Sequence, residues 1–141
     1  AIRLLQSNIF LNGLEGVCER RYLGYGLSDG GAETAFIRTG KDNLGGARVK
    51  EGEGDVPLRT GDQLFGTQEF DLIKIDVEGM EMKVLAGLAG YLAAYPTRIF
   101  IEVDKGNYGA FDEWVAAKGY RVLETFQRYP SNTNFMIEKT S

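Results

Sequence analysis

The amino-acid sequence predicts an α/β fold in which a parallel pair of strands is followed by an antiparallel hairpin. Two strand patterns, the apolar run over residues 70–77 and the run RIFIEV over 98–103, flank a helical pattern that begins at Met80. A strand, a helix and a strand within about thirty residues form a right-handed βαβ unit, so these strands should be parallel neighbours. Two later strand patterns, over 120–127 and 134–138, flank the turn sequence YPSNTN and predict the hairpin.

A helix and two strands are expected at the beginning of the chain. Over residues 2–14 the apolar side chains follow helical spacing, and Gly13 is placed to end that helix. Residues 17–27 and 33–38 have strand-like patterns, and the turn sequence SDGG joins them.

The middle of the chain is expected to be irregular. Residues 39–55 combine five glycines with many charged residues, which predicts a loop. Residues 56–58 should form a short strand at a sheet edge, because Pro57 lacks the N–H group that a central strand donates.

The helices of the second half have clear ends in the sequence. Pro96 marks the exit of the helix that begins at Met80. A further helix is expected over residues 109–118, and Gly119 follows it at the position where a helix cap belongs.

Composition limits the function classes. The chain has 141 residues, 43% of them hydrophobic and 26% charged, which is typical of one globular domain and not of a disordered segment. The net charge is -4, and the longest run of basic residues is the pair Arg20 and Arg21. Partners with a dense negative charge, such as nucleic acids and anionic membranes, are therefore not expected.

The residue types that are absent exclude several chemistries. The chain has no histidine, which rules out Ser-His-Asp triads and histidine-ligated zinc. Cys18 is the single cysteine, so neither an intrachain disulfide nor CxxC chemistry is possible. A lone thiol and the lack of a long apolar run predict a cytoplasmic location. Acid–base chemistry would depend on carboxylates, lysine, tyrosine or the cysteine.

Acidic residues end both strands of the predicted parallel pair. Asp76 closes the first strand, and Glu102 lies near the end of the second. Open α/β sheets bind ligands outside the carboxyl ends of their strands, so we expect Asp76, Glu78 and Glu102 to converge on one crevice, with Asp104 at its rim. Glu78 and Glu81 also lie at the start of the next helix, where negative charge is favourable, and for Glu81 helix capping is the preferred interpretation.

Two turn-like segments have less specific patterns. Ser28 and Asp29 end a predicted strand and begin a Gly-Gly turn, and turn formation explains them as well as ligand contact does. The segment 43–46 (Asn-Leu-Gly-Gly) can bring backbone donors to a ligand, although a plain surface loop is the default interpretation. The chain contains neither GxGxxG nor a Walker motif, so a phosphate-binding loop is not supported.

The segment DLIKIDVEGMEMKVLAGL, residues 71–88, resembles the FkbM family of S-adenosylmethionine-dependent methyltransferases. The segments QSNIFLNGL, GLSDGGAETAF and IFIEV and the loop at 43–46 support this, in the expected order within residues 4–104. The resemblance implies a Rossmann-like domain that uses S-adenosylmethionine to methylate hydroxyl oxygens of sugars or other small natural products. The expected partner is therefore a small-molecule acceptor.

The resemblance also implies roles for individual residues. Asp76 would lie beside the transferred methyl group, as a catalytic and a cofactor-binding residue. Glu78 would lie beside the methyl group or the acceptor, and Glu102 would face the acceptor. Ser28 and Asp29 would lie near the adenine of the cofactor.

Two strands that the resemblance implies are not among the 141 residues. They carry the glycine-rich loop for the amino-acid end of the cofactor and the acid for its ribose. We therefore interpret residues 1–141 as a single, N-terminally truncated methyltransferase-like domain in which cofactor binding is weakened or lost and the enzyme is inactive in the latter case. In the family's sheet order the two strands separate the strand at 17–27 from that at 70–77. We therefore expect either a rearranged sheet or a homodimer formed through the exposed edge.

Two other functions stay open at this point. One is a non-catalytic interaction module that keeps the α/β scaffold. The other is a divalent-metal site formed by Asp76, Glu78 and Glu102, because ligands that are all oxygen suit Mg²⁺ or Ca²⁺.

Overall fold

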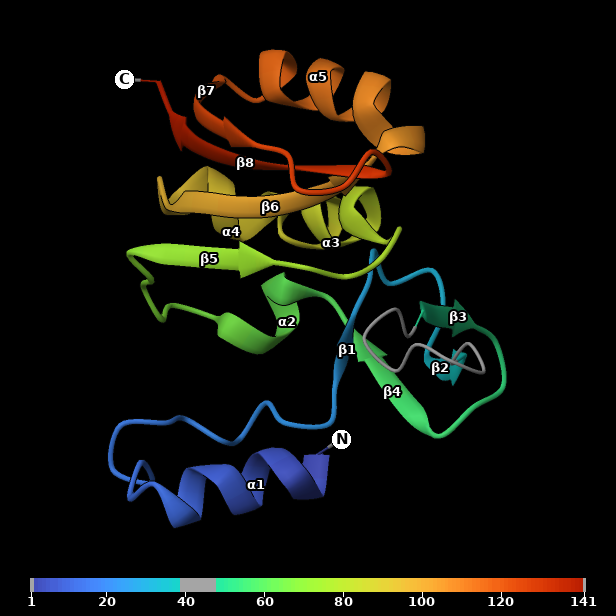
Figure 1. Cartoon of the computed structure of the whole chain (residues 1–141), viewed down its shortest axis with the longest axis vertical. Helices are drawn as coiled ribbons and strands as arrows, with labels where there is room; N and C mark the ends of the chain where they lie inside the picture. Colours follow the sequence, from blue (N-terminus) through green and yellow to red (C-terminus); the bar gives the residue numbers. More distant parts are fainter. Residues whose placement is uncertain (1, 39–47, 141) are drawn as a thin grey trace.

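The computed structural model describes residues 2–38 and 48–140, which contain two four-stranded β-sheets (Figure 1). The C-terminal sheet has the strand order β5-β6-β8-β7, with β5 at Leu72–Ile75, β6 at Arg98–Asp104, β7 at Tyr120–Phe126 and β8 at Asn132–Lys139. The other sheet has the order β1-β4-β2-β3, with β1 at Gly26–Leu27, β2 at Thr34–Arg38, β3 at Arg48–Glu51 and β4 at Val56–Arg59.

The C-terminal sheet confirms the predicted parallel pair and hairpin. Strand β5 runs parallel to β6, from the pair Leu72 and Arg98 to the pair Ile75 and Ile101. Strand β8 runs antiparallel to both β6 and β7. Between β5 and β6 the chain forms two short helices, α3 at Glu81–Gly87 and α4 at Ala89–Ala94. The mixed α/β content is compatible with a methyltransferase-like fold, and the complete Rossmann-like sheet stays a prediction.

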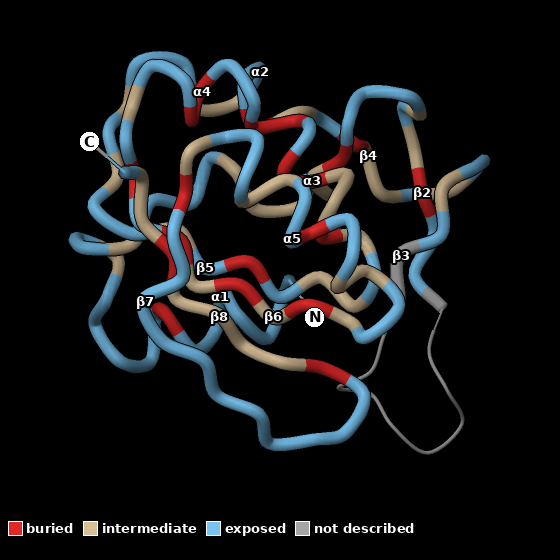
Figure 2. The backbone as a smooth tube through the Cα atoms, turned by 90° about the horizontal axis from the view of Figure 1, so that it is seen from above, coloured by how far each residue is buried: buried red, intermediate tan, exposed pale blue. Residues whose placement is uncertain are grey.

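The core lies on one face of this sheet. Along β6, Ile99, Ile101 and Val103 are buried, whereas Arg98 is exposed and Glu102 is half-buried. The buried face packs in a single cluster with side chains from α3, α4 and the later helix α5 (Tyr108–Ala117). Figure 2 shows buried segments in α3, β5 and β6. Glu102 therefore lies on the face opposite the main core.

Strand β5 is an edge strand among the described residues, because it pairs with β6 alone. Only Ile75 of this strand is buried, although the apolar run over 70–77 predicts a strand of the buried type. A groove of about 240 Å³ follows the strand; it is lined mainly by apolar side chains from β5, β1, α3 and the segment around α2 (Gly61–Phe65). The burial of β5 is thus lower than its sequence suggests, because one side of it has no neighbouring strand.

The strands predicted at 17–27 and 70–77 do not pair with each other. Strand β1 pairs in parallel with β4, in the other sheet. The described strands thus form two separate sheets, and a homodimer through the β5 edge stays a prediction.

Two of the three wrong predictions for the sheet β1-β4-β2-β3 concern the positions of its strands. The strand expected over 17–27 is reduced to Gly26–Leu27, because backbone turns such as the hydrogen bond from Cys18 N–H to the Leu14 carbonyl occupy the preceding residues. The loop expected over 39–55 contains β3 at Arg48–Glu51, which pairs antiparallel with the preceding strand β2. Residues 39–47, which include the 43–46 loop, lie outside the described part of the chain.

Strand β4 is an interior strand, which corrects the prediction of an edge strand at Pro57. Leu58 N–H donates to the carbonyl of Glu33 beside β2. Successive N–H groups point to opposite sides of a strand, so the nitrogen of Pro57 faces β1. Pairing with β1 begins only at Leu58, and the missing N–H therefore costs no ladder hydrogen bond.

The helix ends agree with the glycine pattern. Helix α1 (Ile2–Leu11) is followed by Gly13 with a φ of 63°, and α5 by Gly119 with a φ of 66°. Both values lie in the left-handed region that glycine adopts readily. Helix α2, which the sequence patterns did not predict, begins with a capping box between Thr60 and Gln63. Within the described residues, no helix has the length and apolar character needed to cross a membrane.

Gly87 allows α3 to approach the turn after β1, and its substitution should destabilise the fold. A Cβ atom there would lie 2.0 Å from the Ser28 carbonyl oxygen. We expect Gly87→Ala to lower the free energy of unfolding by about 1–3 kcal/mol, measured by thermal or urea denaturation. The control is Gly109→Ala in α5, where a Cβ meets no atom within 4 Å. Equal stability of the two variants would contradict this reading of the contact.

Candidate functional site

Three carboxylates meet at the carboxyl ends of β5 and β6. Asp76 follows β5 directly, Glu78 lies in the turn after it, and Glu102 lies within β6. One carboxylate oxygen from each of the three residues lies within 4.8 Å of the others. Asp76 is exposed, and Glu78 and Glu102 are half-buried. The parallel direction of β5 and β6 brings these ends to one edge of the sheet, where α/β proteins bind ligands.

The turn after β5 has an uncommon backbone conformation. Glu78 has a φ of 49°, the only positive φ at a non-glycine residue in the described chain, and Gly79 follows with a φ of 99°. A side chain in this region costs of order 1 kcal/mol because its Cβ crowds the backbone. The sharp turn directs the chain from β5 into α3 and places Glu78 beside Asp76.

A buried carboxylate holds this turn. Glu81 is 1% exposed; its Oε1 accepts from Gly79 N–H at 2.7 Å and its Oε2 from Asn107 Nδ2 at 2.5 Å. Asn107 belongs to the 3-10 helix η1 (Lys105–Asn107) that follows β6. Glu81 therefore links the segments that follow β5 and β6, which is a larger role than the helix capping expected from the sequence.

Glu102 is oriented by two amides of the neighbouring strand. Its Oε1 accepts from Asn132 Nδ2 at 2.6 Å and its Oε2 from Asn134 Nδ2 at 3.3 Å. Asn132 and Asn134 alternate along β8, and Asn134 is the direct partner of Glu102. Sequence reasoning missed both amides; the alternating N-T-N pattern opposite an acidic strand is the signal that would have found them.

Asp76 has a cationic neighbour on its own strand. Lys74 Nζ lies 2.6 Å from Asp76 Oδ2, and their side chains are 58% and 45% exposed. An ion pair with this exposure contributes only about 0–1 kcal/mol to stability. Asp76 can therefore exchange this partner for a ligand at little cost.

Ser28 and Asp29 lie outside the carboxylate cluster. Ser28 is fully buried, and its Oγ accepts from Gly30 N–H at 3.2 Å; Asp29 Oδ1 accepts from Gly31 N–H at 2.9 Å. These are the hydrogen bonds of ordinary turns. The segment lies against α3, through the contact between Gly87 and the Ser28 carbonyl. Its predicted role near the adenine stays a prediction.

Lys83 of α3 connects the turn at Asp29 to strand β3. Its Nζ forms a short hydrogen bond with Glu51 Oε2 and lies 3.9 Å from Asp29 Oδ2. The hydrogen bond to Glu51 raises the pKa of Lys83, against the effect of burial. Lys83 therefore stays charged at neutral pH and stabilises the acidic side chains that surround it.

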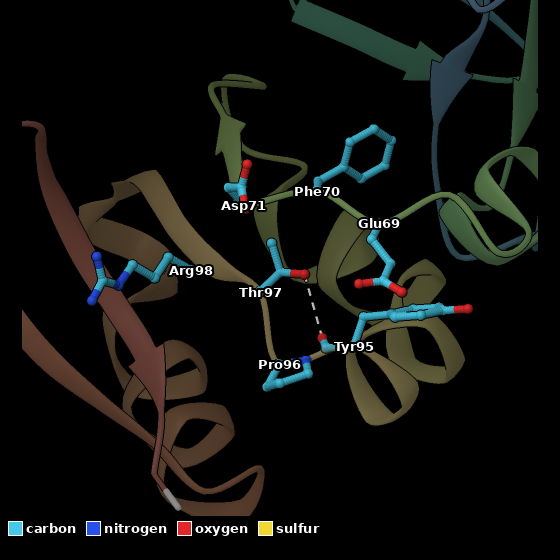
Figure 3. A pocket seen from close by; sticks show the side chains of 7 residues that line it. All are labelled: Glu69, Phe70, Asp71, Tyr95, Pro96, Thr97 and Arg98. Atoms are coloured by element: carbon cyan, nitrogen blue, oxygen red, sulfur yellow. Dashed lines mark hydrogen bonds between the residues drawn. The ribbon is translucent and has the colours of Figure 1, made fainter.

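A second cavity, of about 370 Å³, lies at the opposite end of the parallel pair. Figure 3 shows its lining side chains, which include Glu69, Asp71, Tyr95 and Arg98. Within it, Thr97 Oγ1 donates to the Tyr95 carbonyl at 3.4 Å. Because it opens beside the amino ends of β5 and β6, this cavity is separate from the carboxylates and outside the usual ligand edge of such sheets.

Comparison with known proteins identifies one family. The profile of the family described as methyltransferase FkbM domain matches residues 4–122 of the chain. The match includes all of β5 and β6 and their carboxylates. The comparisons with curated proteins and with solved structures gave no match.

The link between Glu81 and Asn107 should be important for stability. Replacing Asn107 by alanine leaves a carboxylate oxygen of the buried Glu81 without this donor. We expect Asn107→Ala to lower the free energy of unfolding by about 1–3 kcal/mol in urea denaturation. The control is Asn12→Ala, which removes an exposed side-chain hydrogen bond to the Asn8 carbonyl. The prediction fails if both variants unfold at the same urea concentration.

Proposed function

Because the chain belongs to the methyltransferase FkbM domain family, we propose that it is the methyl-transfer part of an S-adenosylmethionine-dependent enzyme. The acceptor is a hydroxyl oxygen of a sugar or of another small natural product. The observation that supports this proposal best is the cluster of Asp76, Glu78 and Glu102 at the carboxyl ends of β5 and β6. Carboxylates at this edge favour a cationic cofactor and can receive a proton from a hydroxyl group.

The residues present fit the reacting end of the cofactor. S-adenosylmethionine supplies a methyl group on a positively charged sulfonium and also has an ammonium group. Three carboxylates within 4.8 Å present the negative charge that such cations require, and the ion pair of Asp76 with Lys74 offsets only part of it. The 141 residues contain no GxGxxG segment, so the fit concerns the charged end of the cofactor and not its nucleotide part.

The environment of each carboxylate supports a different role. Asp76 is exposed beside the sharp turn and lies near the methyl group, where its charge favours cofactor binding. Glu102 is fixed by Asn132 and Asn134 and faces the acceptor. Glu102 would accept the proton of the acceptor hydroxyl, and the cofactor would supply the methyl group. Glu78 positions the acceptor between them.

Comparing how the charge of Asp76 affects the binding of the cofactor and of its uncharged-sulfur product tests this proposal. We expect Asp76→Asn to weaken binding of S-adenosylmethionine about tenfold, or about 1.4 kcal/mol, in calorimetric titrations. Binding of S-adenosylhomocysteine should change less, because that product lacks the sulfonium charge. The control is Asp112→Asn, which removes the same charge from the exposed side of α5. An equal loss for both ligands, or no heat from either with the unmodified chain, would contradict the proposal.

Among the described residues β5 is an edge strand, which favours a second candidate function, a module that associates with a second copy of itself. In a two-fold antiparallel pair of β5 strands centred on Ile75, Lys74 of each copy lies opposite Asp76 of the other. Opposite charges in directly facing positions stabilise such pairs. The apolar groove along β5 adds a surface that such a pairing covers.

Light scattering of the purified chain tests this association. The expected result is a dimer that Lys74→Asp dissociates, because the substitution places like charges across the two-fold axis. Lys118→Asp, at the end of α5, makes the same charge change away from β5 and should leave the dimer intact. A monomer at all concentrations would rule this candidate out.

A further inference from the structure

We propose that Asp76, Glu78 and Glu102, together with Asn132, form a binding site for a divalent cation that prefers oxygen ligands. Oxygens bound to one ion lie at most about twice the metal–oxygen distance apart, which is about 5 Å for Ca²⁺ and about 4.2 Å for Mg²⁺. The three carboxylate oxygens lie within 4.8 Å of one another. A spacing within this bound is compatible with Ca²⁺, and Mg²⁺ would require an inward movement of the side chains.

The buried amide oxygen of Asn132 is an independent observation that points to a ligand. Asn132 is 8% exposed, and its Oδ1 is buried without a hydrogen-bond partner. The other atom of the same amide, Nδ2, lies 2.6 Å from Glu102 Oε1, so the amide is directed at the carboxylate cluster. A buried oxygen without a donor costs about 1–3 kcal/mol. An amide oxygen is also a common ligand of Ca²⁺, so an ion beside Glu102 would satisfy it.

The hydrogen bonds of Glu102 leave room for an ion. An ionised carboxylate offers about four lone-pair positions. Asn132 and Asn134 each donate one hydrogen bond to Glu102, one to each oxygen. These bonds hold the carboxylate in one orientation, as in metal sites where outer residues orient the ligands. Glu102 is therefore a positioned ligand and not a freely rotating surface acid.

If the chain transfers methyl groups as proposed, the bound ion would also restrict which acceptor molecules can bind. An ion at the carboxyl ends of β5 and β6 binds acceptors through two neighbouring oxygens, such as a vicinal diol. It also lowers the pKa of a bound hydroxyl group. Ion binding itself requires neither cofactor nor acceptor, so it is measured separately from methyl transfer.

Titration of the 141-residue chain with CaCl₂ and with MgCl₂, after removal of metals by a chelator, tests the site. Calorimetry and thermal denaturation are carried out at constant ionic strength. We expect a dissociation constant of about 1 mM or below and a rise in the melting temperature. No heat and no shift with either salt would overturn the proposal.

Matched variants assign the site to these residues. Glu102→Gln should weaken binding at least tenfold, whereas Glu113→Gln, on the exposed surface of α5, should not. Asn132→Ala should weaken binding more than Asn134→Ala, because the Asn132 oxygen is the buried one without a donor. If Glu102→Gln fails to fold, the exposed Asp76→Asn replaces it. The assignment would be overturned if Glu102→Gln weakened ion binding no more than Glu113→Gln. It would also be overturned if the two asparagine variants weakened ion binding equally.

Discussion

The buried carboxylate of Glu81 is the interaction on which the geometry of the candidate site depends. It joins Gly79, after β5, to Asn107, after β6, and is 1% exposed. A charged group in that position is stable only while its donors stay in place. The same bonds define the turn that contains Glu78, so the buried Glu81 fixes the position of the half-buried Glu78. The acids at this edge have different roles: Glu81 maintains the structure, and Asp76, Glu78 and Glu102 form the candidate site.

The regular second half of the fold was predictable because its signals are local. A helical pattern between two apolar runs predicts a βαβ unit, and the connection rules for parallel strands then place Asp76 and Glu102 at one edge. The same reasoning failed where glycines, charged residues or a proline obscure the strand pattern. Strand β3 pairs with β2 across the glycine-rich segment, and Pro57 is tolerated inside a sheet because β1 begins its pairing one residue later.

The environment of the site was harder to predict than its acids. The two amides that orient Glu102 come from β8, about thirty residues further along the chain, and only the strand register places them there. Ser28 and Asp29 show the opposite case. Their pattern was compatible with turn formation and with ligand contact, and the structure accounts for both side chains by turn hydrogen bonds. Local sequence thus identified the charged groups, whereas the groups that position them depend on tertiary pairing.

Helix α1 differs from the other helices in its attachment to the fold. Ile9 is its only buried residue, while Leu4, Phe10 and Leu11 are 70–77% exposed. A helix of 10 residues is below the length at which isolated helices are stable in water, so most of its stability must come from packing. With so little packing, α1 opens at a lower free energy than the sheets. The cooperative unit of this chain therefore begins after α1, and amide hydrogens of the first helix exchange with solvent without unfolding of the core.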